Sequence, residues 1–139
     1  MTKWRSKNAI ERAELMLVAI NLHGYYTAFE TLCERVARQL DENVPTGPTW
    51  HAELLAQMQV EVPGLRPRVV DHAATEELHE LHKFRHFFRN AYVLDFDPAL
   101  VAAHAERVLR IHPLLRSGIA GLQLHVDGLQ KALVLKPPG

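Results

Sequence analysis

The sequence predicts an all-α fold, a bundle of four to five antiparallel helices. Apolar residues recur three and four positions apart over long stretches, which is the spacing of the buried face of an amphipathic helix. No stretch alternates apolar and polar residues in the way that marks a half-buried strand. Short segments rich in proline and glycine separate the periodic stretches, and short connections make neighbouring helices run antiparallel.

The first predicted helix covers residues 6–40. Its apolar positions follow the helical spacing, and they are Ile10, Ala13, Leu17, Ile20, Tyr25, Phe29, Leu32 and Val36. Gly24 is its weak point, because glycine in a helix costs about 1 kcal/mol relative to alanine. This glycine could mark either close packing of another helix or a break.

A loop over residues 41–49, with two prolines and a glycine, ends the first helix. Thr49 can then cap a short helix over 50–59, and the Val-Pro-Gly sequence at 62–64 breaks the chain again. Proline suits the first turn of a helix, because its missing N–H would be unpaired there. We therefore expect Pro67 to begin a third helix that covers 68–91.

The last helical region follows the segment LDFDP. Asp97 is expected to cap this region and Pro98 to begin it. A proline inside a helix clashes with the preceding turn, so Pro113 should kink or divide the region into arms over 98–111 and 113–133. The residues from about 134 onward form a frayed tail, and the chain 1–139 is expected to be a single domain.

Charge and cysteine content restrict the possible functions. Sixteen basic and sixteen acidic residues cancel, so any affinity for nucleic acid must come from a local patch. Cys33 is the only cysteine, which excludes an intramolecular disulfide and a thiolate metal cluster and favours a reducing, cytoplasmic location. The amino terminus resembles no targeting signal, and the longest apolar run near it, 15–20, is too short to span a membrane.

Residues 79–97 combine basic, histidine and aromatic side chains. On a wheel of about 100° per residue, the predicted core side of this helix comprises Leu81, Phe84, Phe87, Phe88, Ala91 and Tyr92. The opposite side comprises His79, His82, Lys83, His86 and Asn90, and the two sides are bordered by Arg85 and Arg89.

The polar side allows three interpretations from pattern alone. The first is an ordinary solvated surface. The second is a metal site, because His79, His82 and His86 lie at i, i+3 and i+7, although no acidic or cysteine ligand has convincing spacing. The third is an RNA surface, on which arginines contact phosphates and an aromatic ring stacks on a base.

Three blocks of the sequence resemble HepT-like toxins, which belong to the HEPN ribonucleases. They are NLHGYYTAFETLCERVARQLD (21–41) with the following VPTGPTWHAELLAQM, EVPGLRP (61–67) and LHELHKFRHFFRNAYVLDFD (78–97). The resemblance implies a HEPN-like helical bundle. The family motif is arginine, four residues, histidine, any residue and tyrosine. Here the corresponding residues are Arg85, Asn90 and Tyr92, so asparagine replaces the histidine.

This resemblance implies a metal-independent endoribonuclease without a cofactor, in which a 2′-hydroxyl attacks the adjacent phosphate. Arg85 would stabilise the phosphate charge, because a guanidinium is always charged and binds phosphate through two hydrogen bonds. An asparagine amide does not titrate, so Asn90 cannot act as the base, and cleavage should be weak or absent. The asparagine is either natural or a deliberate substitution. Arg89 and His86 are the further residues expected to contact the substrate.

The resemblance also implies partners. In HepT systems an MNT-type nucleotidyltransferase antitoxin attaches AMP to the motif tyrosine, here Tyr92, although a tyrosine at the edge of an apolar stripe is usually a core residue. Homodimerisation and a tRNA or mRNA substrate are expected as well. The alternative is a helical dimer without catalytic activity that binds a nucleotidyltransferase.

Overall fold

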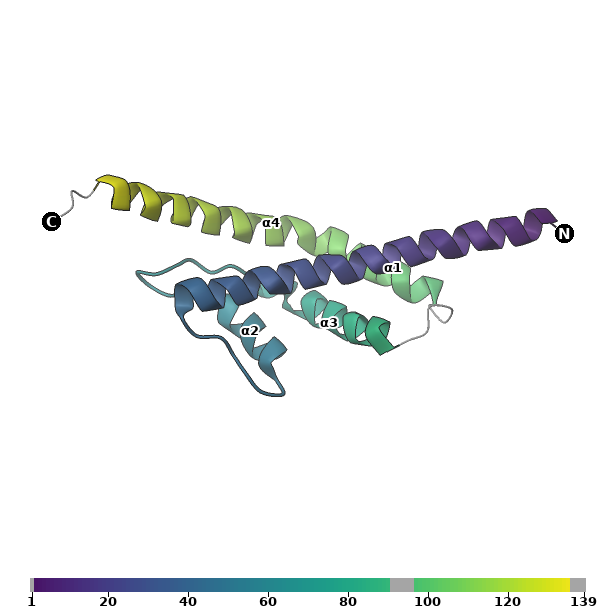
Figure 1. Ribbon diagram of the computed structural model, residues 1–139, viewed down its shortest axis with the longest axis horizontal. Helices are drawn as coiled ribbons and strands as arrows, with labels where there is room; N and C mark the ends of the chain where they lie inside the picture. Colours follow the sequence, from purple (N-terminus) through teal and green to yellow (C-terminus); the bar gives the residue numbers. More distant parts are fainter. Residues whose placement is uncertain (1, 91–96, 136–139) are drawn as a thin grey trace. The chain divides into compact units, whose positions relative to one another are not determined.

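The structure, a computed structural model, describes residues 2–90 and 97–135 and contains four α-helices in these ranges (Figure 1). The helices are α1 (Thr2–Val36), α2 (Trp50–Met58), α3 (Thr75–Asn90) and α4 (Pro98–Leu135). Extended pairing in the described residues consists of one isolated bridge between Val62 and Arg66. The predicted all-α class and number of helices are confirmed.

The chain forms two compact units. The first comprises Met1–Glu30 and Glu76–Arg110, and the second comprises Thr31–Thr75 and Ile111–Gly139. The first unit thus contains most of α1, nearly all of α3 and the beginning of α4. The second contains the end of α1, α2, the loops on both sides of α2 and the remainder of α4. None of the helices in the described ranges has an apolar stretch long enough to cross a bilayer.

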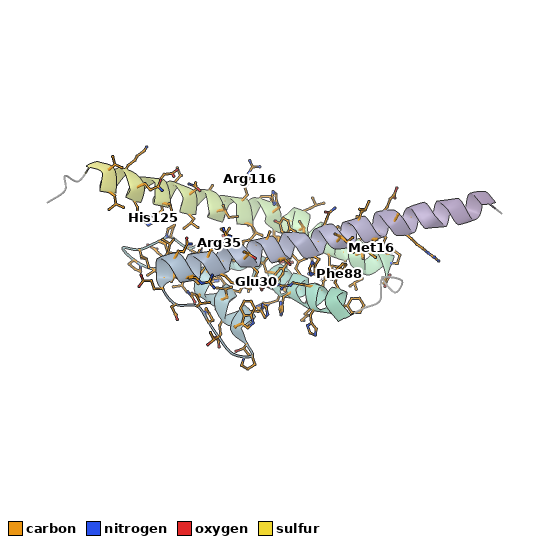
Figure 2. All side chains as sticks on the ribbon, viewed as in Figure 1. Met16, Glu30, Arg35, Phe88, Arg116 and His125 are labelled. Atoms are coloured by element: carbon orange, nitrogen blue, oxygen red, sulfur yellow. The ribbon has the colours of Figure 1, made fainter. Side chains whose placement is uncertain are left out.

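The core of the first unit joins its three helices. The buried residues of this cluster are Ala19, Leu22, Phe84 and Val101. Leu15, Met16, Phe88, Ala105 and Val108 are partly buried against it. Figure 2 marks Met16 on α1 and Phe88 on α3, two of these flanking residues. Large apolar side chains from three segments far apart in sequence therefore exclude water together, which is the main source of stability in such a unit.

Helix α1 extends beyond its predicted start and passes through Gly24 without interruption. A Cβ at Gly24 would meet no atom within 4 Å, so this glycine neither breaks the helix nor admits a close neighbour. After Val36 the helix widens into a π-helical turn, Ala37–Asp41, which ends at Glu42 in the left-handed region (φ 54°). The turn places Asp41 at the end of the helix.

Helix α2 and the start of α4 agree with their predictions. Thr49 is the N-cap of α2, but its hydroxyl is bonded to the Glu53 carboxylate (3.0 Å) and not to the backbone. Asp97 caps α4 by accepting a hydrogen bond from the Ala99 N–H (2.9 Å).

The predicted start of α3 is wrong. The helix begins at Thr75 after a 3₁₀ turn, His72–Ala74, which the Asp71 carboxylate caps through the Ala73 N–H (2.8 Å). Val69 and Val70 are almost fully buried, and both of their N–H groups donate to the carbonyl of Met58 (2.9 and 3.0 Å). Tertiary burial thus holds this segment in an extended form against the helix-start preference of the preceding proline.

Of the two outcomes predicted at Pro113, a kink or a division, the division does not occur, because α4 is one helix of 38 residues with this proline inside it. Ile111 and Leu115, on either side of the proline, are 1% and 2% exposed. Their burial holds both flanking turns in place. Leu109, four residues before the proline, is 75% exposed, so water can reach the carbonyl that proline cannot satisfy.

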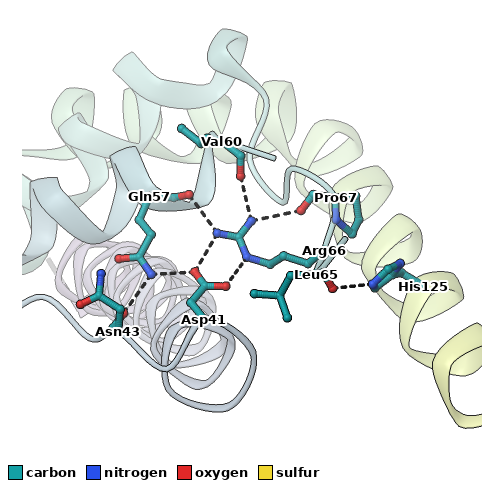
Figure 3. Close-up of polar contacts among 8 residues, drawn as sticks. All are labelled: Asp41, Asn43, Gln57, Val60, Leu65, Arg66, Pro67 and His125. Carbon is teal, nitrogen blue, oxygen red and sulfur yellow. Dashed lines mark hydrogen bonds and ion pairs between the residues drawn. The ribbon is translucent and has the colours of Figure 1, made fainter. Parts of the chain in front are cut away.

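Arg66 organises the loops of the second unit (Figure 3). Its side chain is fully buried, and all five N–H groups of its guanidinium are bonded. Nε and Nη2 donate to the two carboxylate oxygens of Asp41 (2.6 and 2.8 Å). The other three bonds reach the backbone carbonyls of Val60, Pro67 and Gln57 (2.9, 3.1 and 3.1 Å).

The surrounding contacts extend this network. The Gln57 amide donates to Asp41 (2.7 Å) and to the carbonyl of Asn43 (2.9 Å). A ring nitrogen of His125 on α4 lies 2.6 Å from the carbonyl oxygen of Leu65, next to the arginine (Figure 3). Burial alone would raise the pKa of Asp41, but the hydrogen bonds from Arg66 and Gln57 and the Arg66 charge outweigh it and lower the pKa below 3.8.

We predict that this ion pair contributes stability that depends on pH. Since the pKa of Asp41 is lower in the folded chain, its contribution is complete above about pH 4 and is lost as the pH falls through the folded value. Asp41→Asn should lower the free energy of unfolding at pH 7 by about 3–5 kcal/mol, because it leaves a buried guanidinium without its counter-ion. Urea unfolding between pH 2 and pH 7 measures both effects. The exposed pair between Arg68 and Asp71 is the control, and Asp71→Asn should cost less than Asp41→Asn.

Gly118 of α4 is expected to tolerate no side chain. A Cβ there would overlap the carbonyl oxygen of Val69, whereas a Cβ at Gly121 on the same helix would meet nothing within 4 Å. Gly118→Ala should therefore destabilise the protein by about 1–3 kcal/mol or more. Gly121→Ala should raise stability by up to about 1 kcal/mol through helix propensity. Thermal unfolding of both variants tests this pair, and equal effects would contradict the close packing at Gly118.

Candidate functional site

The motif residues lie at the C-terminal end of α3. Arg85 is on the fourth turn of the helix, and Asn90 is its last residue. The side chains of Arg89 and Asn90, and the whole of Tyr92, lie outside the described residues. The structure therefore provides the surroundings of Arg85 and His86, and the predicted roles of the other three residues stay predictions.

Arg85 forms an ion pair with a buried carboxylate of α1. Its Nη1 donates to Oε1 of Glu30 at 2.5 Å, and the two side chains are 15% and 6% exposed. The pair joins residues that are 55 positions apart in sequence. Figure 2 marks Glu30 on α1. A buried carboxylate is costly unless it is paired and hydrogen-bonded, so this contact fixes where the guanidinium lies.

Tyr26, one turn before Glu30, completes the arrangement around the carboxylate. Its hydroxyl donates to Oε2 of Glu30 at 3.0 Å, so each carboxylate oxygen accepts a bond from a different residue. The guanidinium carbon of Arg85 lies 5.8 Å from the centre of the Tyr26 ring, within the range of a cation–π contact. Tyr26 is 7% exposed, so both contacts form in a largely dry environment.

His82 also lies close to the carboxylate of Glu30. It precedes Arg85 by three residues, so both side chains are on the same face of α3. The rings of His82 and Tyr26 are 5.8 Å apart, and a ring nitrogen of His82 lies within 4.8 Å of a carboxylate oxygen of Glu30. We call Tyr26, Glu30, His82 and Arg85 the Glu30 cluster.

The apolar side of α3 agrees in part with the predicted core face. Leu81 and Phe84 are 1% and 3% exposed. Phe88 packs against the core of the first unit, and its ring lies 4.8 Å from that of His23 on α1. The prediction is wrong for Phe87, which is 43% exposed. Phe84 and Phe88 contact each other on the α1 side of the helix, and Phe87 lies outside this contact.

The opposite side of α3 is a solvated surface at several positions. His79, Lys83 and His86 are exposed, and Lys83 pairs with Glu80 one turn earlier (3.1 Å). Within the described residues, His79 and His86 join no group of three ligand side chains close enough to share an ion. The three histidines that suggested a metal site by spacing therefore do not come together, and His82 contacts α1 instead.

His104 of α4 lies behind Phe84 and is a buried histidine of the core. It is 4% exposed, and its ring lies 4.7 Å from that of Phe84. Burial lowers the pKa of His104, and the charge of Arg107 lowers it further, while Glu80 has a smaller opposing effect. This histidine is accordingly held neutral.

Glu30 and Tyr26 were not identified from the sequence as site residues, and His82 was considered only as a candidate metal ligand. A signal was present, because Glu30 shares the helical spacing of four residues of α1 that are buried: Leu22, Tyr26, Phe29 and Cys33. A carboxylate on the core side of an amphipathic helix needs a partner of opposite charge or strong hydrogen bonds. The partner itself could not be found from the sequence, since it is on another helix.

Comparison with known proteins agrees with the family resemblance seen in the sequence. A family model described as HepT-like protein matches residues 17–125. No curated protein and no solved structure matches the chain. The matched range contains all of α2 and α3, the Glu30 cluster and most of α1 and α4. The chain therefore belongs to the HepT-like family of HEPN proteins.

Proposed function

We propose that this protein is the toxin of a toxin–antitoxin pair, an endoribonuclease without metal whose activity is weakened by asparagine at position 90. The observation that carries the proposal is the fixed position of Arg85. The motif arginine is held by Glu30 in the first unit and remains partly exposed, at 15%. A cation placed in this way can bind a phosphate without first losing the freedom of a mobile side chain.

The chemistry follows from the side chains of the motif. Attack of a ribose 2′-hydroxyl on the adjacent phosphate places negative charge on the phosphate oxygens, which a guanidinium stabilises. The bond to Glu30 uses one of the five N–H donors of Arg85. Asn90 can orient a substrate by hydrogen bonding, but it cannot exchange a proton near neutral pH. Arg85 thus supplies electrostatic stabilisation, and proton transfer is the step that is impaired.

Glu30 also affects the charge that a substrate meets. The carboxylate compensates the charge of Arg85, so an RNA phosphate needs additional cations nearby. Lys83 is exposed on α3 and can provide one, as can the neighbouring Arg89. Binding of RNA by such a group should weaken steeply with salt.

A homodimer is part of the proposal. Phe87 is a large apolar side chain on the surface of α3, next to the motif. Burial of such a residue is typical of the centre of a protein interface, and a second copy that packs there would place its own Arg85 near the first. The other candidate function is a helical dimer that binds a nucleotidyltransferase without cleaving RNA, and compensation of Arg85 by Glu30 favours it.

Restoring the motif histidine should restore activity. We predict that Asn90→His raises the rate of tRNA or mRNA cleavage by about 10²–10⁴, the contribution of general acid–base catalysis. Asn90→Gln is the matched control, because it changes the side chain without adding a titratable group. Cleavage is measured with labelled RNA, and toxicity is measured by growth after induction.

Arg85 is tested in the same background. Arg85→Lys keeps a positive charge beside Glu30 but lacks the planar pair of donors, so it should reduce cleavage with little loss of stability. A melting curve of this variant separates the two effects. If Asn90→His neither cuts RNA nor slows growth, the interaction protein without catalysis is the better description.

Tyr92 is expected to accept AMP from the partner enzyme. The added phosphates beside the arginines of α3 would occupy the site for RNA phosphate. On co-expression with an MNT-type nucleotidyltransferase, intact-mass measurement should show increments of one AMP or more. Tyr92→Phe should remove these increments, and Tyr25→Phe on α1 should leave them. An unchanged mass for the native chain in the presence of the active enzyme contradicts this role of Tyr92.

A further inference from the structure

We infer that His82 is the proton-transfer residue of this site, held beside Glu30 and acting with Arg85. The inference rests on the proposed ribonuclease function and assigns the step that Asn90 cannot perform. It concerns residual activity of the chain with asparagine at position 90.

The carboxylate of Glu30 brings the required groups together. It accepts hydrogen bonds from Arg85 (2.5 Å) and Tyr26 (3.0 Å), and a ring nitrogen of His82 lies within 4.8 Å of it. A carboxylate near an imidazole orients the ring and stabilises the imidazolium that forms when it takes a proton. Catalytic contacts are often longer in the free protein and shorten when substrate binds, so the separation is compatible with this role.

His82 and Arg85 are also placed correctly relative to each other. They are three residues apart on one helix, so both face the same side, and both lie against the ring of Tyr26 (5.8 Å in each case). A phosphate bound by Arg85 would therefore lie near the imidazole. This gives a cation and a titratable group side by side, the two components that cleavage of RNA by its own 2′-hydroxyl needs.

The other histidines of the first unit are placed less well. His79 and His86 are exposed on α3. Within the described residues, neither belongs to a group of three side chains that could share a metal ion. His23 stacks on Phe88 at 4.8 Å, and His104 is buried behind Phe84 at 4.7 Å. His82, in contrast, lies close to both Glu30 and Tyr26.

The step that we assign to His82 conserves protons and charge. The neutral imidazole takes the proton of a 2′-hydroxyl while the 2′-oxygen forms a bond to phosphorus. The bond between phosphorus and the 5′-oxygen breaks, and that oxygen takes a proton from water. The imidazolium then returns its proton to the hydroxide that remains. The products are a 2′,3′-cyclic phosphate and a free 5′-hydroxyl, and Arg85 neutralises charge on the phosphate throughout.

The experiment measures residual cleavage by the native chain at high enzyme concentration. The substrate is a labelled oligoribonucleotide, and the same strand with 2′-deoxyribose throughout is the chemical control. His82→Asn should reduce cleavage by about 10²–10⁴, whereas His79→Asn, a matched change at an exposed histidine one turn away, should have little effect. Both changes affect side chains of α3 that are at least partly exposed, and circular dichroism verifies that the fold is retained.

A second measurement excludes a purely structural role for His82. His82→Ala leaves space at a partly exposed position, and added imidazole should restore cleavage to this variant in a concentration-dependent way. It should not restore cleavage to Arg85→Lys. A residue that only supports the fold would show no such rescue.

The outcomes separate this inference from the function on which it rests. If the native chain cleaves RNA and His82→Asn cleaves it at the same rate, the role of His82 is overturned and the proposed ribonuclease function stands. If Asn90→His cleaves RNA and the native chain is completely inactive, the role of His82 is again overturned and the ribonuclease function stands. Inactivity of both proteins contradicts the proposed function and with it this assignment. Loss in His82→Asn with rescue by imidazole supports both.

Discussion

The buried carboxylate of Glu30 is the constraint on which the arrangement of α1 and α3 in the first unit depends. A negative charge that is 6% exposed must be compensated within the protein, because its hydration is lost. Arg85 and Tyr26 provide that compensation, one from each helix. Apolar packing brings the helices together, and the ion pair links one particular residue of α1 to one particular residue of α3. The carboxylate of Glu30 therefore determines where the guanidinium of Arg85 lies.

The second unit also contains a buried ion pair, Arg66 with Asp41, and this pair stabilises the fold. Arg66 and Asp41 are joined by two hydrogen bonds, and the remaining donors of this guanidinium reach backbone carbonyls of the loops around α2. Its side chain is fully buried, so no donor is available to a ligand and the pair serves the fold. Arg85 differs because it is partly exposed and because Glu30 uses only one of its donors. The exposure of the guanidinium thus separates a structural arginine from one that can bind a phosphate.

The sequence was most informative where structure is local. The periodicity of α1, the position of α2 and the cap of α4 at Asp97 were predicted because each depends on residues within a few positions. The start of α3 was not, since burial of Val69 and Val70 overrides the local preference of Pro67. Continuity of α4 through Pro113 likewise depends on burial of the turns beside it. For the site, the motif identified Arg85, but its partner is 55 residues away, and no spacing rule connects positions on different helices.

The same geometry determines what a change at position 90 can do. Arg85 contacts Glu30 and Tyr26 on α1, and neither of these contacts involves the residue five positions later. Under the proposed function, asparagine at that position lacks the titratable group of the family histidine, while Arg85 is still held by Glu30. Proton transfer and charge stabilisation are thus physically separable here, because they depend on different residues. Under the proposed function, binding of RNA phosphate therefore depends on Arg85 and is retained where proton transfer is weak.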